Sequence, residues 1–191
     1  MKELKSLLQK NRSYRRYDAS VKIPDETLRE LVEATRYVAS ARNMQPLRYV
    51  LCNDEDTKAR LFPFLAWAGY LKNWAGPSET ERPSAYIVVC EETDLADAHT
   101  LFDAGLAVQS ILLCAVEKGL GGCIIGAFNK AKVRELLDIP EKYTLLYVLA
   151  IGKPHETVVI EDAKDDIKYW RDENGVHHLP KRELNHLIIN R

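Results

Sequence analysis

The chain has 191 residues, a length that suits one domain with its own hydrophobic core. Apolar residues make up 46% of it and charged residues 29%, a globular composition that excludes an intrinsically disordered chain. The formal net charge of −1 provides no overall field that would attract a nucleic acid or an anionic membrane. We therefore expect a single domain, residues 1–191, without nucleic-acid or membrane partners, in which any anion site is built from a local cluster of basic residues.

The four cysteines lie far apart in sequence, and none forms the C-x-x-C pair of a zinc site or a dithiol redox centre. The N-terminus starts an amphipathic pattern without an apolar signal region, and no run of 18 apolar residues occurs. These features favour buried, reduced cysteines and a cytoplasmic protein.

Helical and strand patterns follow one another along the chain. Leucines 4, 7 and 8 predict a helix that ends near Asn11, and the apolar face after Pro24 predicts a second helix that ends near Ser40. Four apolar runs of strand length predict a core sheet, and they cover residues 47–52, 85–90, 120–125 and 143–151.

Residues 104–116 predict a helix that is apolar around nearly its whole circumference. Such a helix needs cover on every side, which favours a dimer interface over a wholly intramolecular position. Further along, Asn129 is placed to cap a helix that ends at Leu137, before Pro140. Residues 167–179 predict a β-hairpin with Asn-Gly in its turn, and residues 183–189 predict a last helix.

The first segment that could carry chemistry is residues 12–16, Arg-Ser-Tyr-Arg-Arg, in the turn after the first helix. A phosphate monoester is bound by cations that converge with a hydroxyl and backbone N–H groups. Arg12, Ser13 and Arg15 supply such groups within four residues. Taken alone, the cluster also suits a solvated turn, and the near-neutral chain argues against RNA binding.

Two further segments have small side chains that let a flat ligand approach the backbone. Residues 39–46 include Asn43, whose amide can pair with the edge of a heterocycle. Residues 119–128 form a glycine-rich entry to a strand, followed by Gly126 and Ala127, whose N–H groups can face a ring. This segment lacks the glycine patterns of dinucleotide-binding and P-loop motifs. Each segment by itself is also compatible with an ordinary turn.

Together, the order and spacing of the three segments closely resemble the nitroreductase family of FMN-dependent oxidoreductases. The resemblance continues through residues 134–140 and 149–154 and covers roughly residues 1–155. It implies an α+β fold, a three-layer α/β/α sandwich around a mostly antiparallel sheet, in an intertwined homodimer. It also implies an enzyme that uses NAD(P)H and bound FMN to reduce a small conjugated acceptor, a nitroaromatic or a quinone, by ping-pong hydride transfer.

The resemblance further implies which residues bind FMN, while it assigns no catalytic side chain and no metal. One group holds the phosphate, ribityl chain and pyrimidine edge; a second comes from the partner subunit; a third lines the ring near its reactive nitrogen; and a basic pair reaches the phosphate. In that order the groups are Arg12, Ser13 and Arg15; Ser40, Ala41 and Asn43; Ile125, Gly126 and Ala127; Lys181 and Arg182.

The sequence departs from the family pattern at Asn11, where many members have another arginine, so a phosphate contact is left to Lys181 or Arg182. The aromatic segment 64–83 predicts a lid or pocket wall, or else core packing. The neighbouring His177 and His178 point to opposite faces of a strand, so they do not predict a metal site.

Two other functions stay open from the sequence. One is a flavin-binding or sensing module without turnover, and the other is an enzyme of the same fold with specialised flavin chemistry, such as dehalogenation or flavin cleavage. Reduction of the bound flavin by NADH or NADPH separates an enzyme from a binding module.

Overall fold

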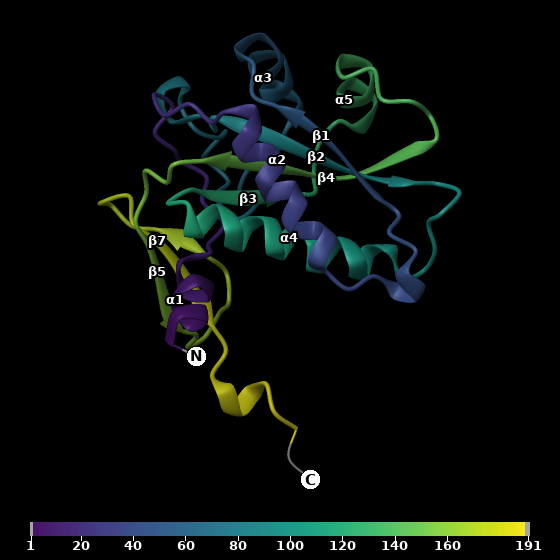
Figure 1. The fold of residues 1–191 in the computed structure, drawn as a ribbon. Coiled ribbons are helices and arrows are strands. Elements are labelled where there is room, and N and C mark those ends of the chain that lie inside the picture. The colour runs from purple at the N-terminus through teal and green to yellow at the C-terminus, as the bar shows by residue number, and fades with distance from the viewer. Residues whose placement is uncertain (1, 190–191) are drawn as a thin grey trace.

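The computed structural model describes residues 2–189 and contains five α-helices and seven strands in those residues (Figure 1). The helices are α1 Lys2–Lys10, α2 Asp25–Glu33, α3 Glu55–Leu61, α4 Thr100–Glu117 and α5 Lys130–Leu136. The strands are β1 Leu47–Cys52, β2 Ala85–Glu92, β3 Gly121–Ile125, β4 Tyr143–Gly152, β5 Val158–Asp162, β6 Trp170–Arg171 and β7 His177–Lys181.

The central sheet has the strand order β1-β2-β4-β3, and each neighbouring pair is antiparallel. Its members are the four predicted core strands, and β1 has the predicted bounds. The interior strand β2 is buried over its first six residues, so it carries apolar side chains toward both faces of the sheet. One face of β2 presents Ala85, Ile87 and Val89, and the other face presents the residues between and after them, Tyr86, Val88 and Cys90.

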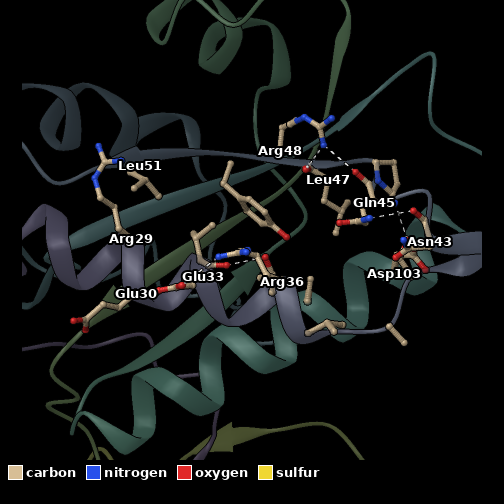
Figure 2. Close-up of a pocket in the computed structure, with 18 of the residues that line it drawn as sticks. Arg29, Glu30, Glu33, Arg36, Asn43, Gln45, Leu47, Arg48, Leu51 and Asp103 are labelled. Carbon is tan, nitrogen blue, oxygen red and sulfur yellow. Dashed lines mark hydrogen bonds and ion pairs between the residues drawn. The ribbon is translucent and has the colours of Figure 1, made fainter.

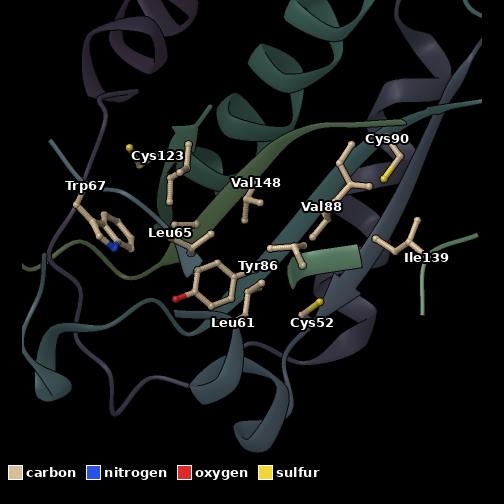
Figure 3. Packing of buried hydrophobic residues seen from close by; sticks show 14 of the residues in the cluster. Cys52, Leu61, Leu65, Trp67, Tyr86, Val88, Cys90, Cys123, Ile139 and Val148 are labelled. Atoms are coloured by element: carbon tan, nitrogen blue, oxygen red, sulfur yellow. The ribbon is translucent and has the colours of Figure 1, made fainter. Parts of the chain in front are cut away.

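Helices cover both faces of this sheet, which confirms the predicted three-layer α+β arrangement. Helices α2 and α4 lie against one face, and α3 and α5 lie on the other (Figure 1). Figure 3 shows the hydrophobic core on the α3 and α5 side of the sheet. There, Tyr86 and Val88 of β2 pack with Leu61 of α3 and Trp67 of the following segment. Each layer therefore excludes water from one side of the sheet.

Three of the cysteines are buried as predicted, and Cys114 is partly buried. Cys52 and Cys90 belong to the core shown in Figure 3. Burial raises the pKa of Cys52 to about 12 and the pKa of Cys90 to about 11. Both side chains are therefore protonated thiols at neutral pH.

Helix α4 has the length and mean hydropathy, 1.5, of a membrane-spanning segment, but half of it is buried inside the protein, as in a core helix. Its inner face, which includes Ala104, Val108 and Ile111, packs on the sheet and on α2. The rest of the helix is covered less completely. Helix α1 also contacts α4, while Leu101 and Phe102 remain 60% and 66% exposed. The single chain thus leaves part of this apolar helix exposed.

The C-terminal part forms a second sheet in the order β5-β7-β6. The predicted hairpin is confirmed in β6 and β7, and Gly175 takes a φ of +78° in its turn. Strand β5 was not predicted, and it pairs in parallel with β7.

Two helix predictions need correction. The helix predicted to end near Ser40 ends as an α-helix at Glu33 and continues as the 3₁₀ turn Ala34–Tyr37. The helix predicted over 183–189 is only the 3₁₀ turn Leu184–His186, whose side chains are exposed. Too little surface packs against this segment to offset the entropy cost of a longer helix.

Candidate functional site

The basic segment after α1 lies beside the glycine-rich strand β3. Ser13 forms a parallel bridge with Gly122, and the backbone N–H of Tyr14 donates to the Gly122 carbonyl at 3.0 Å. The glycines permit this approach, because a Cβ atom on Gly121 would lie 2.6 Å from the Tyr14 ring. Two of the three predicted segments therefore meet.

Their meeting point is a small cavity of about 190 Å³. The predicted residues that line it are Arg15, Ile125, Gly126 and Ala127. The remaining lining residues are Ala66, Trp67, Ala68, Gly69, Cys123, Ile124 and Tyr169. The backbone N–H of Ala66 donates to the Ala127 carbonyl at 3.0 Å, which ties the aromatic segment to this wall. That segment both lines the cavity and packs in the core, since Trp67 is only 9% exposed.

Arg15 reaches the cavity without a carboxylate partner among the described residues. Its Nη1 atom donates to the Ser13 carbonyl at 3.2 Å and lies 3.3 Å from Nε2 of His177. Its guanidinium carbon is 4.8 Å from the centre of the Tyr169 ring, a cation–π distance. The positive charge is thus fixed by neutral groups.

Arg12 is also incompletely paired in the described part of the chain. Its guanidinium donates to the Leu8 carbonyl at the end of α1, while its Nε atom is buried without a partner. Burial lowers the pKa of Arg12, although the nearby Tyr14 opposes the shift. A buried N–H group of a cation gains free energy when an anion accepts from it.

Glu156, which the sequence analysis did not single out, holds the backbone of the basic segment. Its carboxylate accepts from the backbone N–H groups of Arg15 and Arg16 at 2.5 and 3.3 Å and pairs with Arg171 at 3.0 Å. The Glu156 side chain is only 1% exposed. Its separation of 141 residues from Arg15 left no local sequence signal.

The third predicted segment, with Ser40, Ala41 and Asn43, forms a tight loop before β1. Asp103 of α4 accepts from the Ser40 hydroxyl at 2.6 Å and from the Ala41 N–H at 3.1 Å. Asp103 is 3% exposed, so the loop is anchored to a buried charge.

The backbone of this loop is strained. Arg42, Asn43 and Gln45 have φ values of 52°, 55° and 48°, in the left-handed region that non-glycine residues rarely occupy. Such conformations persist where surrounding contacts enforce them, and they cluster at ligand-binding positions. The Ser40 hydroxyl supplies one such contact by accepting from the Gln45 N–H at 2.9 Å.

The loop borders a groove of about 870 Å³ between α2 and β1 (Figure 2). Asn43 and Asp103 lie at one end of it, and Arg29 and Glu30 lie at the other. This groove shares no lining residue with the Arg15 cavity. Since β1 and β3 are the two edge strands, the segments that flank them lie at opposite edges of one sheet.

Lys181 and Arg182 lie at the C-terminal end of strand β7. Lys181 ends β7 opposite Asp162 of β5, and both basic residues are exposed. Their predicted contact with the phosphate stays a prediction.

The adjacent histidines diverge, as predicted. His177 faces Arg15 and Tyr169, whereas His178 faces Glu161 and Asp172 at 3.1 and 3.6 Å. In the described part of the chain, no three His, Cys, Asp or Glu side chains group as metal ligands.

Comparisons with known proteins identify relatives of this chain. A relative from Archaeoglobus fulgidus, whose name assigns it provisionally as an NADH dehydrogenase/NAD(P)H nitroreductase, is 27% identical over 86% of this chain and 93% of its own length. The NADPH-flavin oxidoreductase of Vibrio harveyi is 27% identical over 76% of this chain and 63% of its own.

A solved structure, an FMN-dependent nitroreductase from Clostridium difficile R20291, is 25% identical and superimposes with a TM-score of 0.65, over 84% of this chain and 91% of that one. The family model described as "Nitroreductase family" matches residues 8–153, which include the basic segment, the strained loop and all four strands of the central sheet. The chain belongs to the nitroreductase family.

Proposed function

We propose that the chain is an NAD(P)H-dependent oxidoreductase that binds FMN and reduces a small conjugated acceptor, a nitroaromatic or a quinone, by a ping-pong reaction. The observation that carries this proposal is the cavity in which the Arg15 guanidinium and the backbone of residues 125–127 face one space. The names of the relatives from V. harveyi and C. difficile, which refer to flavin and to FMN, support it.

The residues fit an anionic, planar cofactor. Arg12 has a buried Nε atom free to donate to a phosphate, and Arg15 has a guanidinium charge without a carboxylate partner in the described chain. Gly126 is exposed, and a Cβ atom there would meet nothing closer than Tyr147 at 3.9 Å, so the protein itself does not require a glycine. A glycine at that place keeps the space above the backbone clear for a ring.

When bound, FMN supplies the ring that exchanges hydride, a chemistry that side chains lack. Arg15 would hold the pyrimidine edge of the ring, and its positive charge would favour reduction, which places negative charge on that edge. Trp67 and Tyr169 supply aromatic walls to the cavity.

The site is completed by a second copy of the chain in a homodimer. A cavity of about 190 Å³ is smaller than the roughly 300–1,000 Å³ of pockets that enclose a ligand. The strained loop with Ser40, Ala41 and Asn43 lies at the other edge of the same sheet, so the partner subunit contributes its loop to this FMN. The exposed apolar side of α4 supplies the surface on which the two chains associate.

Stopped-flow mixing of the FMN-loaded protein with NADH or NADPH tests this function. We expect rapid bleaching of the flavin absorbance by at least one nucleotide, followed by reoxidation when a quinone or nitroaromatic compound is added. Bleaching without reoxidation by either compound excludes this class of acceptor. A protein that takes up no FMN, or whose flavin neither nucleotide reduces, contradicts the proposed enzyme.

A further inference from the structure

His177 lies behind Arg15 and belongs to the C-terminal sheet, outside the residues that match the family model. Its side chain is fully buried, and its Nε2 atom is 3.3 Å from Nη1 of Arg15. The Tyr169 ring packs on both, with its centre 5.2 Å from the His177 ring and 4.8 Å from the Arg15 guanidinium. The backbone N–H of His177 donates to the Thr157 carbonyl at 2.8 Å, which fixes the strand that carries it.

The chemistry of this contact determines the protonation of the imidazole. A guanidinium can only donate, so a hydrogen bond between the two groups requires Nε2 of His177 to accept. The ring proton then lies on Nδ1, which is buried without a hydrogen-bond partner in the described residues. Burial, followed by the positive charges of Arg15 and Arg171 and the nearby His178, lowers the pKa of His177 to about 4. A protonated ring would place a second cation against Arg15, and the neutral ring avoids this repulsion.

We propose that His177 is a positioning residue for Arg15, a neutral acceptor that holds the guanidinium toward the FMN site and leaves its charge uncompensated. The inference rests on the proposed function, which it deepens. A carboxylate at this place would hold Arg15 more strongly, but it would also cancel much of the positive charge that favours flavin reduction. An aromatic ring without a nitrogen acceptor would preserve the charge and lose the orientation.

The contacts around Arg15 also separate its backbone, which a carboxylate holds, from its guanidinium, which neutral groups hold. The carboxylate of Glu156 holds the backbone N–H of Arg15 and pairs with Arg171, and it makes no hydrogen bond to the Arg15 guanidinium. Tyr169 is itself braced by Tyr70, with ring centres 4.9 Å apart. The groups that face the Arg15 guanidinium are thus a carbonyl, a neutral imidazole, an aromatic ring and the thiol of Cys123.

A double-mutant cycle tests the proposal. Its readouts are the midpoint potential of bound FMN and the dissociation constant of FMN. We expect His177→Phe to lower the potential and to weaken FMN binding roughly tenfold, a change of about 1.4 kcal/mol. In an Arg15→Ala background the same substitution should change neither quantity, because its effect passes through Arg15. Equal effects of His177→Phe with and without Arg15, or no effect in the wild-type background, overturn the proposal.

Two conservative variants separate positioning from packing. His177→Gln retains an oxygen acceptor, so we expect near wild-type potential and affinity. His177→Glu introduces a carboxylate, so we expect the lowest potential of the series even if FMN stays bound. Thermal melting identifies any variant that has lost its fold, and a Gln variant that folds yet behaves like the Phe variant contradicts the proposal.

A measurement without FMN distinguishes the failure of this inference from the failure of the proposed function. Nitrogen NMR of the histidine rings in the FMN-free protein should show His177 neutral at pH 6 with its proton on Nδ1. The opposite tautomer or a charged ring overturns the inference even if FMN binds and is reduced. A wild-type protein that takes up no FMN overturns both proposals.

Discussion

Gly122 and Gly126 lie four residues apart, yet the chain uses the two glycines differently. A Cβ atom on Gly122 would come within 2.6 Å of the Ala150 carbonyl oxygen, in the middle of the sheet. At Gly126 the nearest atom is 3.9 Å away, at ordinary contact distance. Gly122 is therefore needed for packing, whereas Gly126 borders open space at the proposed FMN site.

We predict that Gly126→Ala leaves folding nearly unchanged, within about 0.5 kcal/mol, because its methyl group has room and the backbone is unstrained. FMN affinity should fall at least tenfold, about 1.4 kcal/mol, because the methyl group takes space reserved for the ring. Urea unfolding and fluorescence titration with FMN measure the two effects. Gly122→Ala is the control and should mainly destabilise the fold. Unchanged FMN affinity in Gly126→Ala would place the ring elsewhere.

At the scale of single residues, the sequence predicted those site residues that lie close together along the chain. The three segments of the proposed site were all recognisable as short motifs. Glu156 was not singled out, and His177 was considered only as a metal ligand, because the contacts of these residues with Arg15 span 141 and 162 residues of sequence. Ile124, which lines the cavity and is 45% exposed, was hidden within an apolar run.

Among the elements, the loop of residues 40–45 depends on α4. Asp103, in the first turn of that helix, accepts from both the Ser40 hydroxyl and the Ala41 N–H. Each left-handed residue of the loop costs of order 1–3 kcal/mol, and contacts of this kind offset the cost. The residue that anchors the loop, Asp103, therefore lies on the same helix turn as the exposed side chains of Leu101 and Phe102.

We predict that Asp103→Ala lowers the free energy of unfolding by roughly 3–6 kcal/mol, because two hydrogen bonds to a charged acceptor are lost at about 1.5–3 kcal/mol each. Asp103→Asn keeps one acceptor and should lose less. Glu117→Ala, in the exposed last turn of the same helix, serves as the control. Chemical denaturation of the three variants measures the differences, and an Asp103→Ala variant as stable as the control would contradict this role.

The sequence predicted those helices and strands whose own residues form a clear apolar pattern. The core strands and α4 have long apolar runs, and their bounds were found within a few residues. Helix α3 was missed because its seven residues, Glu55–Leu61, are mostly polar and form only two turns. Strand β5 was missed because its five residues are mostly exposed and end in Glu161 and Asp162, so they lack the long apolar run of the core strands.

At the scale of the whole molecule, the proposed site consists of two halves at opposite edges of the central sheet. A single chain brings Arg12 and Arg15 to β3, while it holds the loop with Asn43 beside β1. Association through the exposed side of α4 would bring the Arg15 half of the site in one chain next to the Asn43 half of the site in the other chain. Cofactor affinity should then depend on protein concentration, since dilution separates the chains.

We predict that Phe102→Glu, which places a charge on the exposed side of α4, converts a dimer into a folded monomer and weakens FMN binding more than tenfold. Light scattering after size exclusion measures the mass, and FMN titration measures the affinity. Arg60→Glu changes the charge on α3, across the sheet, and should leave both unchanged. A wild-type monomer that binds FMN tightly would rule out the shared site.

The thiols of the core have a consequence for durability. Oxidation of a cysteine begins from its thiolate, and the pKa values of Cys52 and Cys90, about 12 and about 11, keep that form scarce. Both side chains are also closed off from solvent, with exposed fractions of 2% and 1%. The protein thus keeps these two thiols where peroxides and other oxidants have little access, so repeated turnover should leave Cys52 and Cys90 of the core unoxidised.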